Sequence, residues 1–344
     1  YTTIDKPKLH FNTKLYTGNG GTQSITGVGF APDWTLLKDR NDTSGTRAYD
    51  TVRGAIKRIR TDLTDAEIDD SDGLTAFGSD GFTLGADGAT NANSTLYVSW
   101  NWKAGGTASS NSDGSITSSV SANTTAGFSI VSWVGNSSAS TVGHGLGSVP
   151  KMIIVRNRTD AEDWIVYHGA NTSAPETDYL VLNLTNATGD SSGVWNDTAP
   201  TSSVFSVGTA NSTNGSSDNM IAYCFAPVTG FSAMGSYVGN GNSDGPVILT
   251  GHKPAMVIIK RTDTAGYAWR IVDNKRLGYN GASYSLNPND SSAEGTSDRL
   301  DFLSNGIKLT TSATSFNASG GTYIYLAFAS ASFVSSGNVP CTGF

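Results

Sequence analysis

The sequence predicts an all-β protein of three tandem β-sandwich domains, for which the jelly roll is one candidate topology. Apolar or alternating runs of four to eight residues are separated by Gly, Asn, Asp and Ser turns throughout the 344 residues, which is typical of short strands. Charged residues make up only 15% of the chain, and Gly, Ser, Thr and Asn take their place. One set of sequence features also recurs three times in the same order.

The recurring set has five members, and it predicts an internal repeat of a whole domain. An aromatic residue opens an x-Gly-Asn turn at Tyr16, Trp133 and Tyr237, and a proline follows a glycine-rich stretch at Pro32, Pro150 and Pro254. After an apolar run come an alternating segment (49–53, 164–168 and 269–273), a short strand after a turn (81–85, 204–208 and 306–309) and a closing aromatic strand (97–102, 220–225 and 323–328). Unequal spacing of the prolines favours domains with variable loops over a solenoid of ~20–50-residue units.

These features divide the chain into six segments. Residues 1–10 are an N-terminal segment that we interpret as a truncated connection, and residues 332–344 are a C-terminal tail. The three sandwich repeats are expected at 11–105, 126–228 and 229–331. The Ser/Gly/Asn/Thr-rich stretch 106–125 is predicted to be a linker. Thr64-Asp-Ala-Glu67 has the pattern of a capping box, which predicts a helix of about two turns.

The charge of the chain argues against several partners. A net charge of −7 repels phosphates, so nucleic acid is not an expected partner. No apolar run approaches the ~18 residues of a membrane span, so we expect no membrane insertion. A basic cluster at 53–60 is followed directly by an acidic one at 62–72, and we expect the two to pair with each other or with a neighbouring subunit.

The candidate catalytic motifs are weak, and we expect no enzyme and no catalytic residues. The pattern G-x-S-x-G occurs around Ser191 and Ser243, but no helical pattern follows either serine, as a nucleophile elbow requires. The four histidines lack metal-ligand spacing, and His144 and His252 are expected in surface turns. We expect no cofactor and no metal, with calcium at the acidic turn 69–73 as a minor alternative.

A sugar site is the one binding site that the residues suggest. Sugars are commonly held by an exposed aromatic face together with amide and carboxylate hydrogen bonds, and Trp195, Asn196 and Asp197 supply these groups in a loop of the second repeat. Trp100 and Trp102 have the same chemistry, but strand alternation places both on one face, which we expect to be buried.

Several of these segments resemble a repeated domain in virion proteins of marine tailed bacteriophages. The likeness covers nearly the whole chain and is carried by Tyr16-Thr-Gly-Asn-Gly, Ile25-Thr-Gly-Val-Gly-Phe-Ala-Pro-Asp33, Val142-Gly-His-Gly-Leu-Gly, Pro150-Lys-Met-Ile-Ile-Val, Trp164-Ile-Val-Tyr-His168, the stretch 195–205, the stretch 219–226 and the C-terminal 327–341. These motifs are turns and strands. The resemblance therefore implies a fold and a setting but no catalytic residues.

The resemblance implies a virion structural protein at the particle surface. We expect a tail-fibre or spike segment that engages the host cell surface, acts as a homotrimer, contacts other virion proteins and binds a host surface glycan. One alternative is a capsid decoration or head-fibre protein. A second alternative, from another functional class, is a secreted carbohydrate-binding module.

Overall fold

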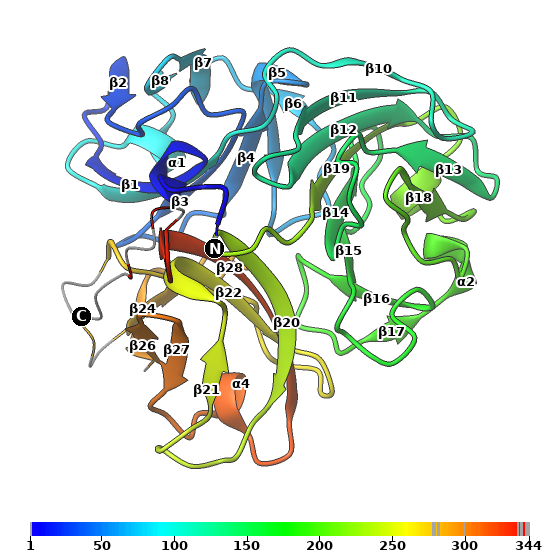
Figure 1. The fold of residues 1–344 in the computed structure, drawn as a ribbon. Helices are drawn as coiled ribbons and strands as arrows, with labels where there is room; N and C mark the ends of the chain where they lie inside the picture. The colour runs from blue at the N-terminus through cyan, green and yellow to red at the C-terminus, as the bar shows by residue number, and fades with distance from the viewer. Residues whose placement is uncertain are drawn as a thin grey trace.

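The computed structural model describes residues 2–276, 280, 283–298, 300–335, 337 and 340. Its chain forms three β-rich lobes around a common centre, coloured blue to cyan, green, and yellow to red in Figure 1. The all-β prediction is therefore confirmed. No helix among the described residues is long and apolar enough to span a membrane.

The first lobe is the first repeat, and the short 3-10 helix η1 (Pro7–Leu9) precedes it. It has two antiparallel sheets, ordered β1-β9-β3-β4-β5-β6 and β2-β8-β7. Its elements are β1 (Phe11–Thr17), β2 (Gln23–Thr26), β3 (Trp34–Asp39), β4 (Arg47–Asp50), β5 (Gly54–Arg60), β6 (Ile68–Asp69), β7 (Leu74–Gly78), β8 (Gly81–Leu84), α1 (Gly88–Asn91) and β9 (Leu96–Trp102).

The second repeat has sheets ordered β10-β11-β12-β19-β14-β15-β16-β17 and β13-β18. Its elements are β10 (Ser109–Asn111), β11 (Ser118–Asn123), β12 (Phe128–Val134), β13 (Ser140–Gly143), β14 (Met152–Asn157), β15 (Ile165–His168), β16 (Asp178–Val181), β17 (Gly189–Asp190), α2 (Ser192–Trp195), β18 (Val204–Val207), α3 (Asn211–Asn214) and β19 (Asn219–Phe225).

The third repeat has sheets ordered β20-β28-β22-β23-β24-β25 and β21-β27-β26. Its elements are β20 (Ser232–Val238), β21 (Val247–Leu249), β22 (His252–Arg261), β23 (Arg270–Asp273), β24 (Ser283–Leu286), β25 (Gly295–Asp298), β26 (Leu300–Leu303), β27 (Gly306–Leu309), α4 (Thr314–Asn317) and β28 (Thr322–Ser332).

The large sheets of the three repeats share one strand order. In each, the last strand lies between the first strand and the strand that holds the apolar run after the proline: β1-β9-β3, β12-β19-β14 and β20-β28-β22. The register also agrees, because Trp34, Met152 and Met256 lie opposite Trp102, Phe225 and Phe328, the corresponding residues of the three last strands.

The central strands of each large sheet are buried on both faces, and strand alternation decides which residue faces which core. In β19, Ile221, Tyr223 and Phe225 pack into a core that all three repeats share. The intervening Met220, Ala222 and Cys224 pack into a separate core inside the second repeat, against its small sheet. The first and third repeats have private cores of the same kind, so every repeat is a β-sandwich.

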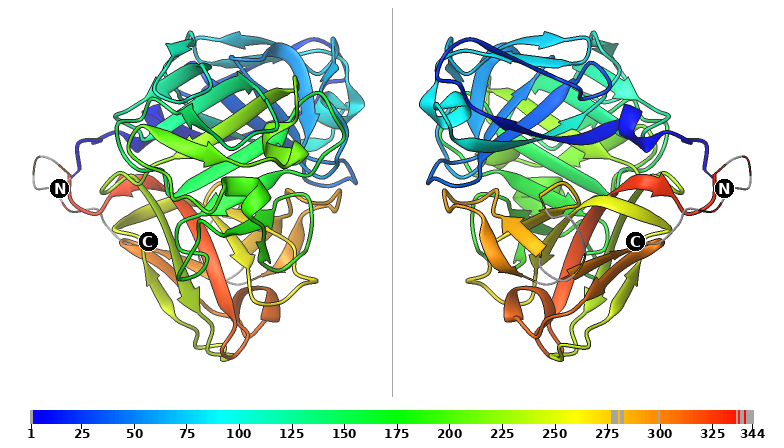
Figure 2. Two further views of the ribbon diagram at one scale, coloured as in Figure 1. Left: turned by 90° about the vertical axis from the view of Figure 1, so that its right-hand side faces the viewer. Right: turned by 90° about the vertical axis from the view of Figure 1, so that its left-hand side faces the viewer.

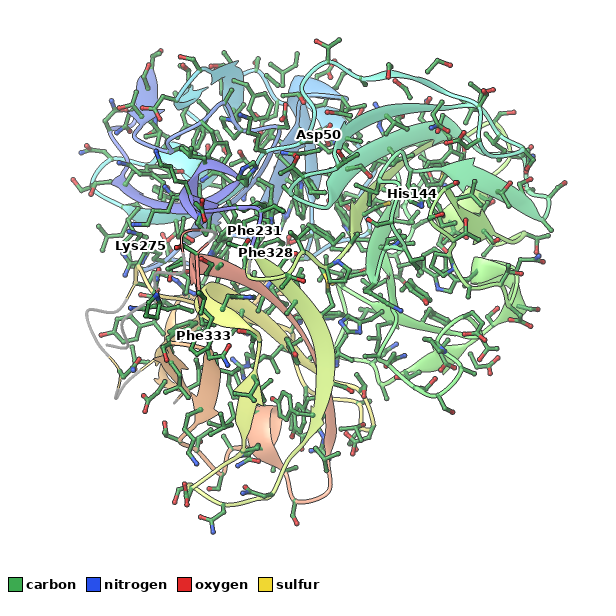
Figure 3. The ribbon with its side chains drawn as sticks, in the orientation of Figure 1. Asp50, His144, Phe231, Lys275, Phe328 and Phe333 are labelled. Carbon is green, nitrogen blue, oxygen red and sulfur yellow. The ribbon has the colours of Figure 1, made fainter. Side chains whose placement is uncertain are left out.

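The shared core closes around the corresponding aromatic residues Trp102, Phe225 and Phe328. Their ring centroids are 6.5 Å apart for Trp102–Phe225 and 5.8 Å apart for each of the other two pairs. Phe328 lies in the middle of Figure 3, where the lobes meet. The three repeats therefore form a closed ring around a pseudo-threefold axis, and the side views in Figure 2 show the third repeat packed against the other two.

The linker predicted at 106–125 is wrong. Strand β11 from this stretch pairs with β12, and β10 pairs with β11, so both extend the large sheet of the second repeat. Val120 is buried in the private core of that repeat, and Ser118 Oγ donates to the carbonyl oxygen of Gly143 at 2.8 Å. The prediction failed because strands of a half-buried sheet can carry many small polar side chains, which is also the composition of a linker.

The helix predicted from Thr64–Glu67 is also wrong, because these residues form no helix and the second repeat binds their backbone carbonyl groups. Arg156 Nη2 donates to the carbonyl oxygens of Thr64 and Asp65, at 2.6 Å each. The Glu67 carboxylate, which would have capped the helix, pairs with Arg158 at 2.7 Å instead.

Candidate functional site

The predicted sugar platform at Trp195 is not exposed. The indole ends the short helix α2 and is only 2% exposed, with its ring edge-on to Tyr167 at 6.0 Å in the private core of the second repeat. Asn196 and Asp197 follow it at the surface with φ of 53° and 44°. A sugar therefore has no indole face to stack on here. Trp100 and Trp102 are buried, as alternation predicted.

The other candidates from the sequence are structural. Ser191 precedes α2, which has only four residues, and it has no helix of the length that a nucleophile elbow requires. His144 and His252 are fully buried, so the expectation of surface turns is wrong. Within the described part of the chain, no group of three His, Cys, Asp or Glu side chains is placed to hold a metal ion. Cys224 is a free, buried thiol, and Cys341 lies outside the described residues.

The adjacent basic and acidic clusters pair with each other, as the sequence predicted. The pairs within the first repeat are Arg53–Glu67, Lys57–Asp69, Arg58–Asp70 and Arg60–Asp62. Asp69 and Asp70, two members of the predicted calcium turn, are therefore engaged by cations of the protein itself.

Polar groups join the repeats at corresponding positions. We call the contact between the first and second repeats the first seam. The second seam joins the second and third repeats, and the third seam joins the third and first. At the first seam, where Figure 3 labels Asp50, the Tyr223 hydroxyl donates to Asp50 Oδ2 at 2.7 Å. At the third seam Trp100 Nε1 donates to Asp273 Oδ2 at 3.0 Å. Each carboxylate also pairs with the arginine three residues later, Arg53 or Arg276, and these side chains are fully buried.

At the second seam, a histidine takes the place of the buried Asp–Arg pair. His168 lies where the other repeats have Asp50 and Asp273, because the three residues are opposite the corresponding residues Met152, Trp34 and Met256. Its partner strand offers Leu326, which has no donor, where the others offer Tyr223 and Trp100. His168 instead donates from Nε2 to the carbonyl oxygen of Tyr325 at 3.1 Å.

Three buried basic side chains complete the seams in a cyclic pattern. Lys38, Arg156 and Lys260 are the fifth residues counted from Trp34, Met152 and Met256. Each reaches backbone carbonyls of the preceding repeat in the ring, at Asp290 (2.7 Å), Thr64 and Asp65 (2.6 Å each) and Thr185 (3.4 Å). Burial lowers the pKa of both lysines to about 8. These three buried cations therefore help to hold neighbouring repeats together.

The second seam is expected to weaken in acid. Burial lowers the pKa of His168 from 6.5 to about 4, and its Nδ1 accepts the Ala170 N–H at 3.2 Å, a bond that protonation removes. Because the unfolded chain takes up this proton more readily, stability is full above pH 6.5 and falls by up to about 3 kcal/mol as the pH drops towards 4. Unfolding measured across this range should show the loss.

The variant His168→Gln keeps a side-chain N–H donor but no longer titrates. It should lose part of the pH dependence while His10, His144 and His252, whose pKa values burial also lowers, retain the rest. An unchanged dependence on pH in this variant would show that His168 does not titrate in this way.

A groove lies at the third seam, between the first and third repeats. One cavity of about 290 Å³ is lined by residues of β1, β22 and β28 and by the turn that follows β23. A wider cavity of about 510 Å³ adjoins it, and the two share Lys8, Ser330 and Ala331. Lys275 marks this seam in Figure 3, between the blue and orange lobes. We call both cavities together the lysine groove.

The lysine groove was missed in the sequence because its walls come from distant segments. Lys6 and Lys8 precede β1, Lys253 lies in β22 and Lys275 follows β23. Nothing in the spacing of these four lysines indicates that they line one surface feature.

The family described as a domain of unknown function (DUF7483) matches residues 6–332, a range that spans all three repeats. The chain belongs to this family. Among curated proteins, none matches the chain significantly. The match treats the three sandwiches as one unit, in agreement with the core that they share.

Proposed function

We propose that this protein is a structural component of a tailed-bacteriophage particle, a tail-fibre or spike segment at the virion surface that engages the host cell. The observation that carries the proposal is the shared core, which locks three sandwiches into one rigid body. A rigid body of this kind suits a mechanical and display role. The sequence resemblance to virion proteins of marine tailed phages supplies the setting.

The chemistry of the described residues fits this role better than catalysis. The buried Asp–Arg pairs, the buried lysines and the buried histidines are engaged with neighbouring repeats or lie within cores, and they line neither cavity of the lysine groove. The groove itself gathers lysines, hydroxyls and amides. Such a set binds a ligand by charge and hydrogen bonds and has no paired carboxylates to act as acid and base.

The proposal includes self-association and contacts with other virion proteins. One chain already closes around a pseudo-threefold axis, so it can match a threefold environment in the particle without two further copies. Static light scattering tests the homotrimer that the resemblance implies. A measured mass of three times the 35.8 kDa chain mass supports the trimer, and a measured mass equal to one chain rejects it.

The test of function is localisation by cryo-electron microscopy on particles shown by mass spectrometry to contain the chain. Density at the tail supports a role in host attachment. Density over the head rejects that role and supports capsid decoration, to which the pseudo-threefold body would be suited on a local threefold axis. Secretion of the chain without any particle would reject both and support a carbohydrate-binding module.

A further inference from the structure

The smaller cavity of the lysine groove holds polar atoms that lack a partner. Thr13 is only 4% exposed, and no described residue forms a hydrogen bond with its Oγ1. Asn274 is partly exposed, but its Oδ1 atom is buried and also lacks a described partner, and both residues line the 290 Å³ cavity. An unpaired buried polar atom costs roughly 1–3 kcal/mol, so a ligand that offers hydroxyls would recover part of that cost.

The charge around these atoms is positive. Lys8, Lys253 and Lys275 line the smaller cavity, and Lys6 and Lys8 line the wider one, where Asp5 adds a carboxylate. Lys8 and Lys275 are exposed, so their ammonium groups remain hydrated and able to meet an anion. This concentration of positive charge occurs on a chain whose net charge is −7. It therefore favours an anionic ligand at this seam over the rest of the surface.

The remaining walls are small and partly apolar. Phe11, Ala255 and Ala331 contribute carbon surface, and Asn12 adds an amide beside Thr13. The cavity volume of about 290 Å³ is near the lower end of the ~300–1,000 Å³ usual for small-ligand sites, which suits one sugar ring with room for its neighbours in the adjoining cavity.

We propose that the lysine groove binds an acidic sugar unit, a carboxylate-bearing ring of a cell-surface polysaccharide, at the seam between the first and third repeats. The carboxylate pairs with Lys8 and Lys275, and ring hydroxyls bond to Thr13 Oγ1 and Asn274 Oδ1. This inference rests on the proposed function, because it names the class of host molecule that the particle would meet. It also moves the expected glycan contact away from Trp195.

The first test is isothermal titration calorimetry of the full chain with tetragalacturonate, neutral cellotetraose and inorganic phosphate. We expect binding of tetragalacturonate only, weakened at least tenfold by Lys8→Gln with Lys275→Gln. The matched control is Lys103→Gln with Lys151→Gln, two exposed lysines outside the groove, which should leave the affinity unchanged. No binding, equal binding of phosphate, or equal weakening by the control pair would overturn the proposal.

The variant Thr13→Val gives a second, independent readout. It removes the unpaired hydroxyl but keeps the volume, so we expect at least fivefold weaker binding of tetragalacturonate together with an unchanged or higher midpoint of urea unfolding. Unchanged affinity would show that the hydroxyl does not contact the sugar and would overturn its assigned role.

Failure of the groove and failure of the proposed function give different results in a cell-binding assay with labelled chain. If wild-type chain and the Lys8→Gln/Lys275→Gln variant bind host cells equally, the groove assignment is wrong and the attachment role stands. If tetragalacturonate binds in the groove but the chain lies on the head of the particle, the groove stands and the attachment role is wrong.

Discussion

Replacing Phe225 by alanine should lower the free energy of unfolding by about 3–5 kcal/mol, the usual cost of removing a fully buried phenyl ring. Phe225 is 1% exposed and contacts the rings of both Trp102 and Phe328 on the pseudo-threefold axis. The cavity left behind would therefore border three repeats at once. Urea unfolding gives the size of the loss, and hydrogen exchange shows where protection is lost.

The location of the lost protection separates a shared core from three independent ones. Phe225→Ala should reduce protection in β9 and β28 as well as in β19. The control Phe205→Ala removes an equally buried ring from the private core of the second repeat, so its first effects should stay within that repeat. Loss confined to the second repeat in both variants would contradict the shared core.

Replacing Asp50 by alanine is expected to cost about 3–5 kcal/mol, because it leaves the buried guanidinium of Arg53 without its main carboxylate. It also removes the acceptor of the Tyr223 hydroxyl at the first seam. The pair Arg261–Asp263, whose aspartate is an exposed residue, is the control, and Asp263→Ala should cost no more than about 1 kcal/mol because solvent screens the carboxylate. Urea unfolding measures both.

A rescue separates the buried charge from the packing around it. The triple variant Asp50→Leu, Arg53→Met, Tyr223→Phe removes the three polar side chains of this contact and should recover part of the lost stability. The recovery is partial because the backbone N–H groups of Val52 and Arg53 still lose Asp50 as their acceptor. Glu67 keeps Arg158 as its partner in that variant. A triple variant as unstable as Asp50→Ala would mean that packing at the seam, and not the uncompensated charge, sets the cost.

The strands of the repeats could be predicted from the sequence because each repeat has turns and a proline at corresponding positions. The runs after Pro150 and Pro254, and the aromatic strand 220–225, became β14, β22 and β19. Strands β10 and β11 could not be predicted, because serines that face a half-buried sheet have the same composition as serines in a linker. The helix at Thr64 failed because its capping group, Glu67, is used by the neighbouring repeat.

The alternation of apolar and polar residues in the strands predicts neither the ring nor the lysine groove. Alternation identifies Tyr223 and Trp100 as facing inward, but it does not say which sheet they meet. One signal was present: Asp50 and Asp273, which both lie in predicted strands, are each followed three residues later by an arginine. The groove needs Thr13 and Asn274 together, and their separation along the chain leaves no pattern to find.

The contact that closes the ring is the third seam, which joins the first and third repeats without a direct chain connection. There Arg40 Nη2 and Nε donate to the Glu294 carboxylate at 2.9 and 3.3 Å, as Arg158 does to Glu67 at the first seam. A double-mutant cycle of Arg40→Ala and Glu294→Ala in urea unfolding tests this closure most directly. The closed ring predicts a coupling of about 0.5–3 kcal/mol between these two residues. Additive losses, with no coupling, would contradict it and leave three sandwiches joined only in a row.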